Sequence, residues 1–161
     1  MLDISVIVPV YNGESFIDRC MGSLLIQDGC DFEIVAINDG STDNTSQLLL
    51  KWQRFLGSRL KIIEQNNSGV AAARNRAIEN ALGKYISFLD VDDEYLPGRL
   101  SKYVDLFESE ADVGVIYSDP VVNSGQSEYR YYEFKRKQTY QGWIYKEILG
   151  HFPLILSTVA C

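Results

Sequence analysis

Short apolar runs alternate with amphipathic segments along the first 118 residues, and this alternation constrains the fold more than any other feature. The runs are rich in Val and Ile, as in strands that are buried on both faces of a sheet. In the segments between them, apolar residues recur at helical spacing. The predicted strands are 4–8, 33–38, 61–64, 85–89 and 113–117, and the predicted helices are 16–25, 45–56, 70–82 and 98–107.

Strand–helix alternation with short connections predicts parallel βαβ units. We therefore expect an α/β fold with a mostly parallel sheet and helices on both faces. Ser41 or Thr42 is expected to cap the second helix, and Gly83 to follow the third helix in the left-handed conformation. The alternation stops after residue 119. There we expect a strand at 129–134, a short helix at 143–149 and a last strand at 154–159.

The composition is that of one soluble globular domain, with 161 residues, 46% of them hydrophobic and 23% charged. The net charge of −7 argues against a nucleic-acid partner, because such binding relies on clustered Lys and Arg. Three cysteines without metal-ligand spacing indicate a reduced, cytoplasmic environment. No apolar run approaches the roughly 18 residues that span a bilayer, so we expect no transmembrane segment. Peripheral association with the inner membrane and oligomer formation both stay open.

Polar residues and glycines follow four of the predicted strands, at 9–13, 39–41, 68–69 and 90–93. Ligands of open parallel sheets bind beyond the carboxyl ends of the strands, so these residues form the candidate site. The last of them holds Asp90, Asp92 and Asp93. Three carboxylates on one loop repel each other unless a divalent cation compensates. The alternative is that Asp92 and Asp93 cap the following helix.

A nucleoside diphosphate suits such a site only together with a cation. A carboxylate about 4 Å from a phosphate charge costs on the order of 4 kcal/mol at an effective dielectric constant of about 20, and a bridging Mn²⁺ or Mg²⁺ reverses that sign. Neither a Gly-x-x-x-x-Gly-Lys-Ser/Thr nor a Gly-x-Gly-x-x-Gly loop follows any predicted strand, which disfavours the other common phosphate-binding loops. The single histidine, His151, has no second histidine or cysteine pair to indicate zinc.

Four ordered blocks carry a family resemblance. Residues 5–12 read SVIVPVYN, residues 33–45 read EIVAINDGSTDNT, residues 67–78 read NSGVAAARNRAI, and residues 85–97 read YISFLDVDDEYLP. Together they resemble glycosyltransferase family 2, whose members have the Rossmann-like GT-A fold. The last block corresponds to that family's Asp-x-Asp metal motif. The resemblance implies one domain, 1–161, in which 1–118 bind a nucleotide-sugar donor and 119–161 begin the acceptor-side part.

The resemblance also implies roles for individual residues near the base. Pro9 and Tyr11 would line the base pocket, with Tyr11 packing on the uracil, and Asn12 would belong to the same donor-binding loop. Asp39 would hydrogen-bond the base. Gly69 would let the backbone approach the nucleotide where a side chain would obstruct it.

Near the phosphates, the resemblance makes Asp92 the expected direct ligand of Mn²⁺ or Mg²⁺, with Asp93 as a weaker second. Asp90 would face the ribose or reach the metal through water. Arg74 would support the Asp loop or the phosphates. The alternative for Arg74 and its neighbour Asn75 is a structural hydrogen-bonding role.

The resemblance implies an inverting enzyme that transfers a sugar from a nucleotide-diphosphate sugar to an acceptor hydroxyl. In this family the donor is usually linked to UDP. The acceptor would be a glycan or a lipid-linked molecule in the synthesis of cell-envelope polysaccharide. Its general base is a carboxylate expected beyond Cys161, so the domain is expected to be truncated; Asp119, Glu128 and Glu133 stay open as substitutes. Two other interpretations are a non-catalytic nucleotide-sugar-binding module and a receiver-like signalling domain. The latter needs a Lys after a late strand, where Ser118-Asp119-Pro120 stands.

Overall fold

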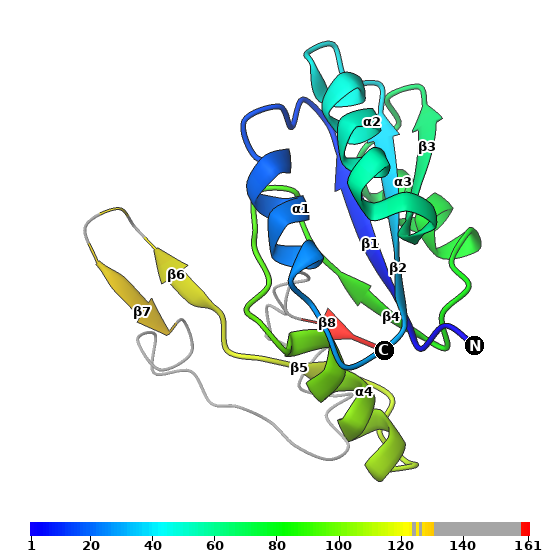
Figure 1. The fold of residues 1–161 in the computed structure, drawn as a ribbon, viewed down its shortest axis with the longest axis vertical. Helices are drawn as coiled ribbons and strands as arrows, with labels where there is room; N and C mark the ends of the chain where they lie inside the picture. The colour runs from blue at the N-terminus through cyan, green and yellow to red at the C-terminus, as the bar shows by residue number, and fades with distance from the viewer. Residues whose placement is uncertain (124, 126, 131–158) are drawn as a thin grey trace.

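The computed structural model describes residues 1–123, 125, 127–130 and 159–161. In these residues a six-stranded sheet is flanked by helices, and a two-stranded hairpin projects from it (Figure 1). The elements in chain order are β1 (Ile4–Val10), α1 (Ile17–Leu25), β2 (Phe32–Asp39), α2 (Thr45–Leu56), the 3₁₀ helix η1 (Gly57–Arg59), β3 (Leu60–Gln65), α3 (Val70–Glu79), β4 (Tyr85–Phe88), α4 (Arg99–Ser109), β5 (Ile116–Tyr117), β6 (Val121–Asn123), β7 (Glu128–Arg130) and β8 (Val159–Ala160).

The sheet has the strand order β3-β2-β1-β4-β8-β5. The β1–β2, β2–β3 and β1–β4 pairs are parallel, whereas β8 is antiparallel to both of its neighbours. The chain builds outward from β1 to one side and then returns to add β4 on the other side. The boundary between β1 and β4 is therefore the topological switch point, where open α/β sheets bind their ligands.

Alternate residues of the central strands enter two separate cores. Val6 and Val8 of β1 pack with α1, α2 and α4 in the larger core, while Ile7 packs with Ala73 and Ala77 of α3 on the opposite face. This period of two is what a strand with both faces buried requires. The structure thus confirms the predicted mostly parallel sheet with helices on both faces.

Two sequence-based predictions of helix ends are wrong. Neither Ser41 nor Thr42 caps α2, because both bond to Asn12 in the loop after β1. At the start of the helix the Thr45 N–H donates instead to a side-chain oxygen of Asp43, at 3.0 Å. Gly83 does not terminate α3, which ends at Glu79.

A glycine is required at position 83 because there is no room for a side chain. A left-handed conformation is not the reason, since the φ of Gly83 is not positive. A Cβ at this position would lie 2.5 Å from the backbone N of Ser5 and 2.6 Å from the carbonyl carbon of Ile4. The connection from α3 to β4 therefore passes directly against the start of β1. A buried carboxylate fixes this contact, because Glu33 accepts hydrogen bonds from the Ser5 hydroxyl and the Leu82 N–H.

The later part of the chain departs from the prediction or lies outside it. β5 is shorter than the predicted strand 113–117. The predicted strand 129–134 is described only to residue 130, where β7 pairs antiparallel with β6. The predicted helix 143–149 and most of the predicted strand 154–159 lie outside the described residues. Among the residues that are described, no helix is both long and apolar enough to cross a membrane.

Candidate functional site

The loops that follow β1 and β4 meet at the switch point. Val91, in the loop after β4, lies against Gly13, in the loop after β1: a Cβ on Gly13 would be 3.2 Å from the Cγ2 of Val91 and 2.7 Å from the Cγ1 of Val10. The middle residue of the Asp-x-Asp sequence is therefore packed inward. Residues 90–93, hereafter the acid loop, are held at this edge of the sheet.

A second contact joins the loops that follow β1 and β2. The Asn12 N–H donates to the Ser41 hydroxyl at 2.9 Å, and the Asn12 side-chain oxygen accepts from the Thr42 N–H at 2.8 Å. The Gly13 N–H donates to the Thr45 hydroxyl at 2.8 Å. Asn12 has a φ of +50°, which asparagine tolerates better than most residues. Residues 11–15 and 41–45 thus form a hydrogen-bonded pair of loops, hereafter the loop clasp.

Two carboxylates complete the loop clasp. Glu14 accepts from the backbone N–H of Asn44 at 3.0 Å and from its side-chain amide at 2.9 Å. Asp43 accepts from the N–H groups of Glu14 and Thr45. Burial raises the pKa of Asp43, but these hydrogen bonds lower it by more, so the net pKa lies below its ordinary value. The clasp is therefore intact at neutral pH.

The loop clasp sets the positions of the residues expected to line a base pocket. Pro9 lies inside β1, buried, with its register partner Ile37 in β2. Tyr11 stands at the end of the same strand, and 52% of its surface is exposed. An exposed aromatic ring on a loop with fixed backbone can stack on a planar ligand without prior rearrangement. The backbone N–H and the side-chain oxygen of Asn12 already make the hydrogen bonds of the clasp.

Asp39 is buried at the end of β2, with 3% of its surface exposed. One carboxylate oxygen accepts from the Gln65 side chain at 2.7 Å and the Ser68 N–H at 2.8 Å, and the other from the Gly69 N–H at 2.9 Å. Burial raises the pKa of Asp39, but the three hydrogen bonds lower it by more, and the net direction is downward. Asp39 is thus an ionised anchor for the loop at 66–69.

Gly69 immediately precedes α3 and has a φ of +85°, a conformation that favours glycine. No heavy atom lies within 4 Å of where its Cβ would be. The structure therefore leaves open space at Gly69, and its N–H is directed at Asp39.

The acid loop is linked to α3 by an ion pair. A terminal guanidinium nitrogen of Arg74 lies 2.5 Å from a carboxylate oxygen of Asp90, with 17% of the Arg74 side chain and 34% of the Asp90 side chain exposed. The Nε of Arg74 is buried and has no hydrogen-bond partner in the described part of the chain. Asn75, the next residue, is exposed. Arg74 thus compensates one of the charges on the acid loop.

Asp92 differs from its neighbours because no described residue pairs with it. Asp90 is paired with Arg74, and its carbonyl accepts from the Asp93 N–H at 3.0 Å in a tight turn. Asp92 is exposed and makes no hydrogen bond or ion pair with any residue that the structure describes. Neither Asp92 nor Asp93 caps α4, because that helix begins only at Arg99. The alternative structural role for these carboxylates is therefore wrong.

The acid loop carries three aspartates, of which Asp90 and Asp92 are the two expected to serve a divalent cation. In the described residues no three His, Cys, Asp or Glu side chains converge as a metal cluster. Magnesium and similar hard cations are nevertheless often held by one or two carboxylates together with phosphate oxygens and water. Asp92, whose oxygens bond to none of the described residues, and Asp90, with one oxygen on Arg74, fit a cation of that kind that arrives with its ligand.

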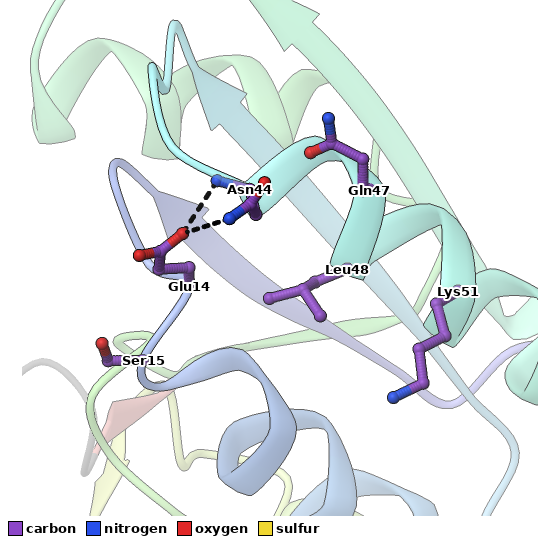
Figure 2. A pocket seen from close by; sticks show the side chains of 6 residues that line it. All are labelled: Glu14, Ser15, Asn44, Gln47, Leu48 and Lys51. Atoms are coloured by element: carbon purple, nitrogen blue, oxygen red, sulfur yellow. Dashed lines mark hydrogen bonds between the residues drawn. The ribbon is translucent and has the colours of Figure 1, made fainter.

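A separate open depression of about 600 Å³ lies between the start of α1 and α2 (Figure 2). The residues that line it are Glu14, Ser15, Asn44, Gln47, Leu48 and Lys51. It borders the loop clasp, since Glu14 and Asn44 are bonded across it, but none of the predicted site residues line it. The predicted site residues lie instead at the carboxyl ends of β1, β2, β3 and β4 and in α3.

The sequence of this chain matches the model of glycosyl transferase family 2 over residues 5–156. The chain belongs to that family. An uncharacterized glycosyltransferase of Rickettsia conorii is 34% identical over 156 residues, which are 97% of this chain and 25% of the relative. TuaG of Bacillus subtilis, a putative teichuronic acid biosynthesis glycosyltransferase, is 36% identical over 63% of this chain and 40% of its own length. This family 2 chain therefore spans well under half of such relatives.

Solved glycosyltransferase structures agree with the GT-A-like fold. S. aureus TarS in complex with UDP-GlcNAc has a TM-score of 0.68 and 35% identity, over 76% of this chain and 36% of that one. The mannosyltransferase PcManGT from Pyrobaculum calidifontis, in complex with GDP-Man and Mn²⁺, has a TM-score of 0.65 and 28% identity, over 71% of this chain and 34% of that one. These matches confirm both the family and the fold expected from the four sequence blocks.

Several residues that shape this family 2 site are not singled out by sequence analysis. Glu14 and Asp43 hold the loop clasp, and Tyr95 and Gln27 hold the far side of the acid loop. The only local indication is Asp43, which precedes the predicted start of a helix by two residues. Of the substitute bases, Asp119 is half-buried after β5, Glu128 is exposed in β7, and Glu133 lies outside the described residues.

Proposed function

We propose that this chain is the donor-binding part of an inverting glycosyltransferase that moves a sugar from a UDP-sugar to an acceptor hydroxyl. The observation that carries the proposal is the state of Asp92. It is an exposed carboxylate without a partner in the described chain, at the switch point of the sheet, beside Asp90, whose charge Arg74 already compensates. A group in that position is available for a cation that arrives with a diphosphate.

The base side of the proposed site is formed by the loop clasp and the loop held by Asp39. Tyr11 presents an exposed ring for the base, and Gly69 leaves space for the nucleotide beside it. Both oxygens of Asp39 already accept hydrogen bonds, so contact with the base uses a remaining lone pair. Uracil is supported by TarS, whose structures contain UDP or UDP-GlcNAc.

Asp92 would hold the divalent cation directly, and Asp90 would reach it through water or face the ribose. Bound Mn²⁺ or Mg²⁺ would neutralise the diphosphate leaving group. The residues of this chain hold the rest in place: Arg74 keeps Asp90 from repelling Asp92, and Val91 fixes the loop against Gly13. Mn²⁺ in the PcManGT complex supports the same class of cation here.

The acceptor in this proposal is a hydroxyl of a glycan or lipid-linked glycan of the cell envelope. The name of TuaG, a putative teichuronic acid biosynthesis enzyme, supports that product class. A carboxylate general base would remove the hydroxyl proton as the oxygen attacks the anomeric carbon. We assign that base to none of the described residues.

The test is thermal melting of the chain with UDP, GDP, CDP or dTDP, each with Mn²⁺ or with EDTA. Ligand at about 100 times its dissociation constant adds roughly 2.7 kcal/mol, which is about 5–10 °C for a domain of this size. We expect such a shift with UDP and Mn²⁺, and its loss with EDTA. Asp92→Ala removes the proposed ligand and should abolish the metal-dependent part of the shift.

Asp28→Ala is the matched control, because Asp28 is also exposed but lies in the loop after α1. It should melt with the same UDP- and Mn²⁺-dependent shift as the wild type. A folded wild-type chain that shifts with none of the four nucleotides would refute the donor site. A shift that Asp92→Ala retains in full would leave the site but remove Asp92 as the metal ligand.

A further inference from the structure

Tyr95 lies three residues beyond Asp92 and is almost completely buried, with 2% of its surface exposed. Its hydroxyl donates to the backbone carbonyl of Phe88 in β4 at 2.7 Å and lies 2.6 Å from the hydroxyl of Ser87. Desolvation raises the pKa of the Tyr95 phenol far above its ordinary value, so the hydroxyl remains a donor throughout the pH range of the folded protein. The side chain therefore turns back and bonds to the strand from which its own loop departs.

The backbone at Tyr95 is fixed by α1. The Tyr95 N–H donates to the Ser23 hydroxyl at 3.0 Å. One turn further along, the Gln27 side-chain amide donates to the carbonyl of Leu96 at 3.0 Å, and its oxygen accepts from the N–H of Arg99 at 3.1 Å. Gln27 thereby satisfies the first turn of α4, which has no capping side chain of its own.

Arg99 packs its guanidinium group against the same cluster. Its guanidinium carbon lies 4.1 Å from the centre of the Tyr95 ring and 4.9 Å from the centre of the Tyr103 ring. Tyr95 is therefore held through its hydroxyl, its backbone N–H and its ring face. None of these contacts involves an atom of Asp90, Asp92 or Asp93.

The acid loop is consequently fixed at both ends. At one end Arg74 holds Asp90, and at the other Tyr95 holds the chain against β4 and α1. Asp92 lies between these points and is itself unpartnered in the described chain. A carboxylate on a loop with fixed ends loses little conformational freedom when it binds, which improves affinity without any new contact.

We infer that Tyr95 is a positioning residue of the donor site, whose buried hydroxyl orders the acid loop so that Asp92 is presented to the cation–diphosphate unit. This inference rests on the proposed function. Ser23 acts with it, because the Ser23 hydroxyl fixes the Tyr95 backbone from α1. Neither residue touches the donor.

The test compares Tyr95→Phe with Tyr103→Phe. Tyr103 is a matched control because it is 5% exposed and contacts the same Arg99. Its substitution by Phe also removes a hydroxyl hydrogen bond, the one to Ser118 at 3.0 Å. Binding of UDP in the presence of Mn²⁺ is measured by titration calorimetry, and melting temperature without ligand is measured alongside. Exchange of the Asp93 amide hydrogen, which is bonded to the Asp90 carbonyl, is followed by NMR without any ligand.

Both variants should lose a similar amount of thermal stability, but only Tyr95→Phe should weaken UDP binding. We expect about a three- to tenfold loss, the equivalent of one buried hydrogen bond. The Asp93 amide should exchange faster in Tyr95→Phe and at the wild-type rate in Tyr103→Phe. Ser23→Ala should change the affinity and the exchange rate in the same direction as Tyr95→Phe.

A Tyr95→Phe variant that binds within twofold of the wild type would overturn the inference. Equal losses of affinity in Tyr95→Phe and Tyr103→Phe would overturn it as well, because the effect would then be one of general stability. If the wild type itself fails to bind UDP with Mn²⁺, the proposed function is refuted and the positioning role with it. Wild-type binding of UDP with Mn²⁺ that Tyr95→Phe retains refutes only the positioning role and leaves the proposed function in place.

Discussion

Three aspartates of the site differ through their surroundings. Asp39 is buried and accepts hydrogen bonds from another loop, Asp90 pairs with Arg74, and Asp92 faces solvent. Their position after predicted strands placed all of them in the candidate site. The residues that hold Asp39 and Asp90 could not be predicted, because Gln65 and Arg74 reach them from elements that are distant along the chain.

Asp39→Asn should reduce stability at neutral pH and have less effect in acid. A carboxyl with a lowered folded-state pKa stabilises the fold above its unfolded pKa, near 3.9, and this contribution is lost as pH falls through the folded pKa. Hydrogen bonds to a buried charge are worth about 1–3 kcal/mol. Urea denaturation should therefore show a loss of about that size at pH 7, which shrinks below pH of about 4.

Asp28→Asn, at an exposed position, should stay within about 0.5 kcal/mol of the wild type at both pH values. A loss in Asp39→Asn that is the same at pH 7 and in acid would contradict the role of the Asp39 charge in holding the loop at 66–69.

At the scale of elements, the strands and helices up to residue 109 were predictable within a few residues, because their apolar periods are strong. The ends of the elements were not. Side chains from elsewhere satisfy them: Gln27 of α1 serves the first turn of α4, and Ser41 and Thr42 bond to Asn12 instead of to α2. Gly83 was misassigned because its reason, close contact with β1, is a tertiary one.

Two glycine-to-alanine changes separate the effect of close packing from the effect of helix propensity. Gly83→Ala puts a methyl group against the backbone of Ser5 and Ile4, and should cost about 1–3 kcal/mol, as overpacking does. Gly22→Ala lies in α1 with open space around its Cβ, and should stabilise the protein by roughly 0.5–1 kcal/mol through helix propensity. Chemical denaturation measures both. A Gly83→Ala variant that is as stable as the wild type or more stable would show that packing at Gly83 is looser than the structure indicates.

At the scale of the whole molecule, the gathering of the site loops at the carboxyl ends of the strands was predictable because it follows from the succession of parallel βα units. The position of β8 between β4 and β5 was not, since β8 joins residues far apart in sequence by antiparallel pairing. The larger core extends across this sheet, with Cys20 of α1 at its centre and 0% exposed. Burial, and then the nearby acidic residues, raise the pKa of the Cys20 thiol well above its ordinary value.

Cys20 therefore reports opening of the whole core. In a Cys30→Ser, Cys161→Ser background, its labelling by a thiol reagent should require unfolding and follow the equilibrium population of the open state. UDP with Mn²⁺ at about 100 times the dissociation constant should slow labelling by about a hundredfold. Labelling that is fast and indifferent to ligand would mean that α1 opens without the rest of the fold.

The contact between Val91 and Gly13 joins two sequence positions that are 78 apart, so each limits what the other can become. A larger side chain at one position would take up space that the side chain at the other position needs. A lineage that adds a methyl group at position 13 has to make room against Val10 and also remove bulk at position 91 or displace the two aspartates on either side. We therefore expect the size of the residue between those aspartates to vary together with the residue at position 13.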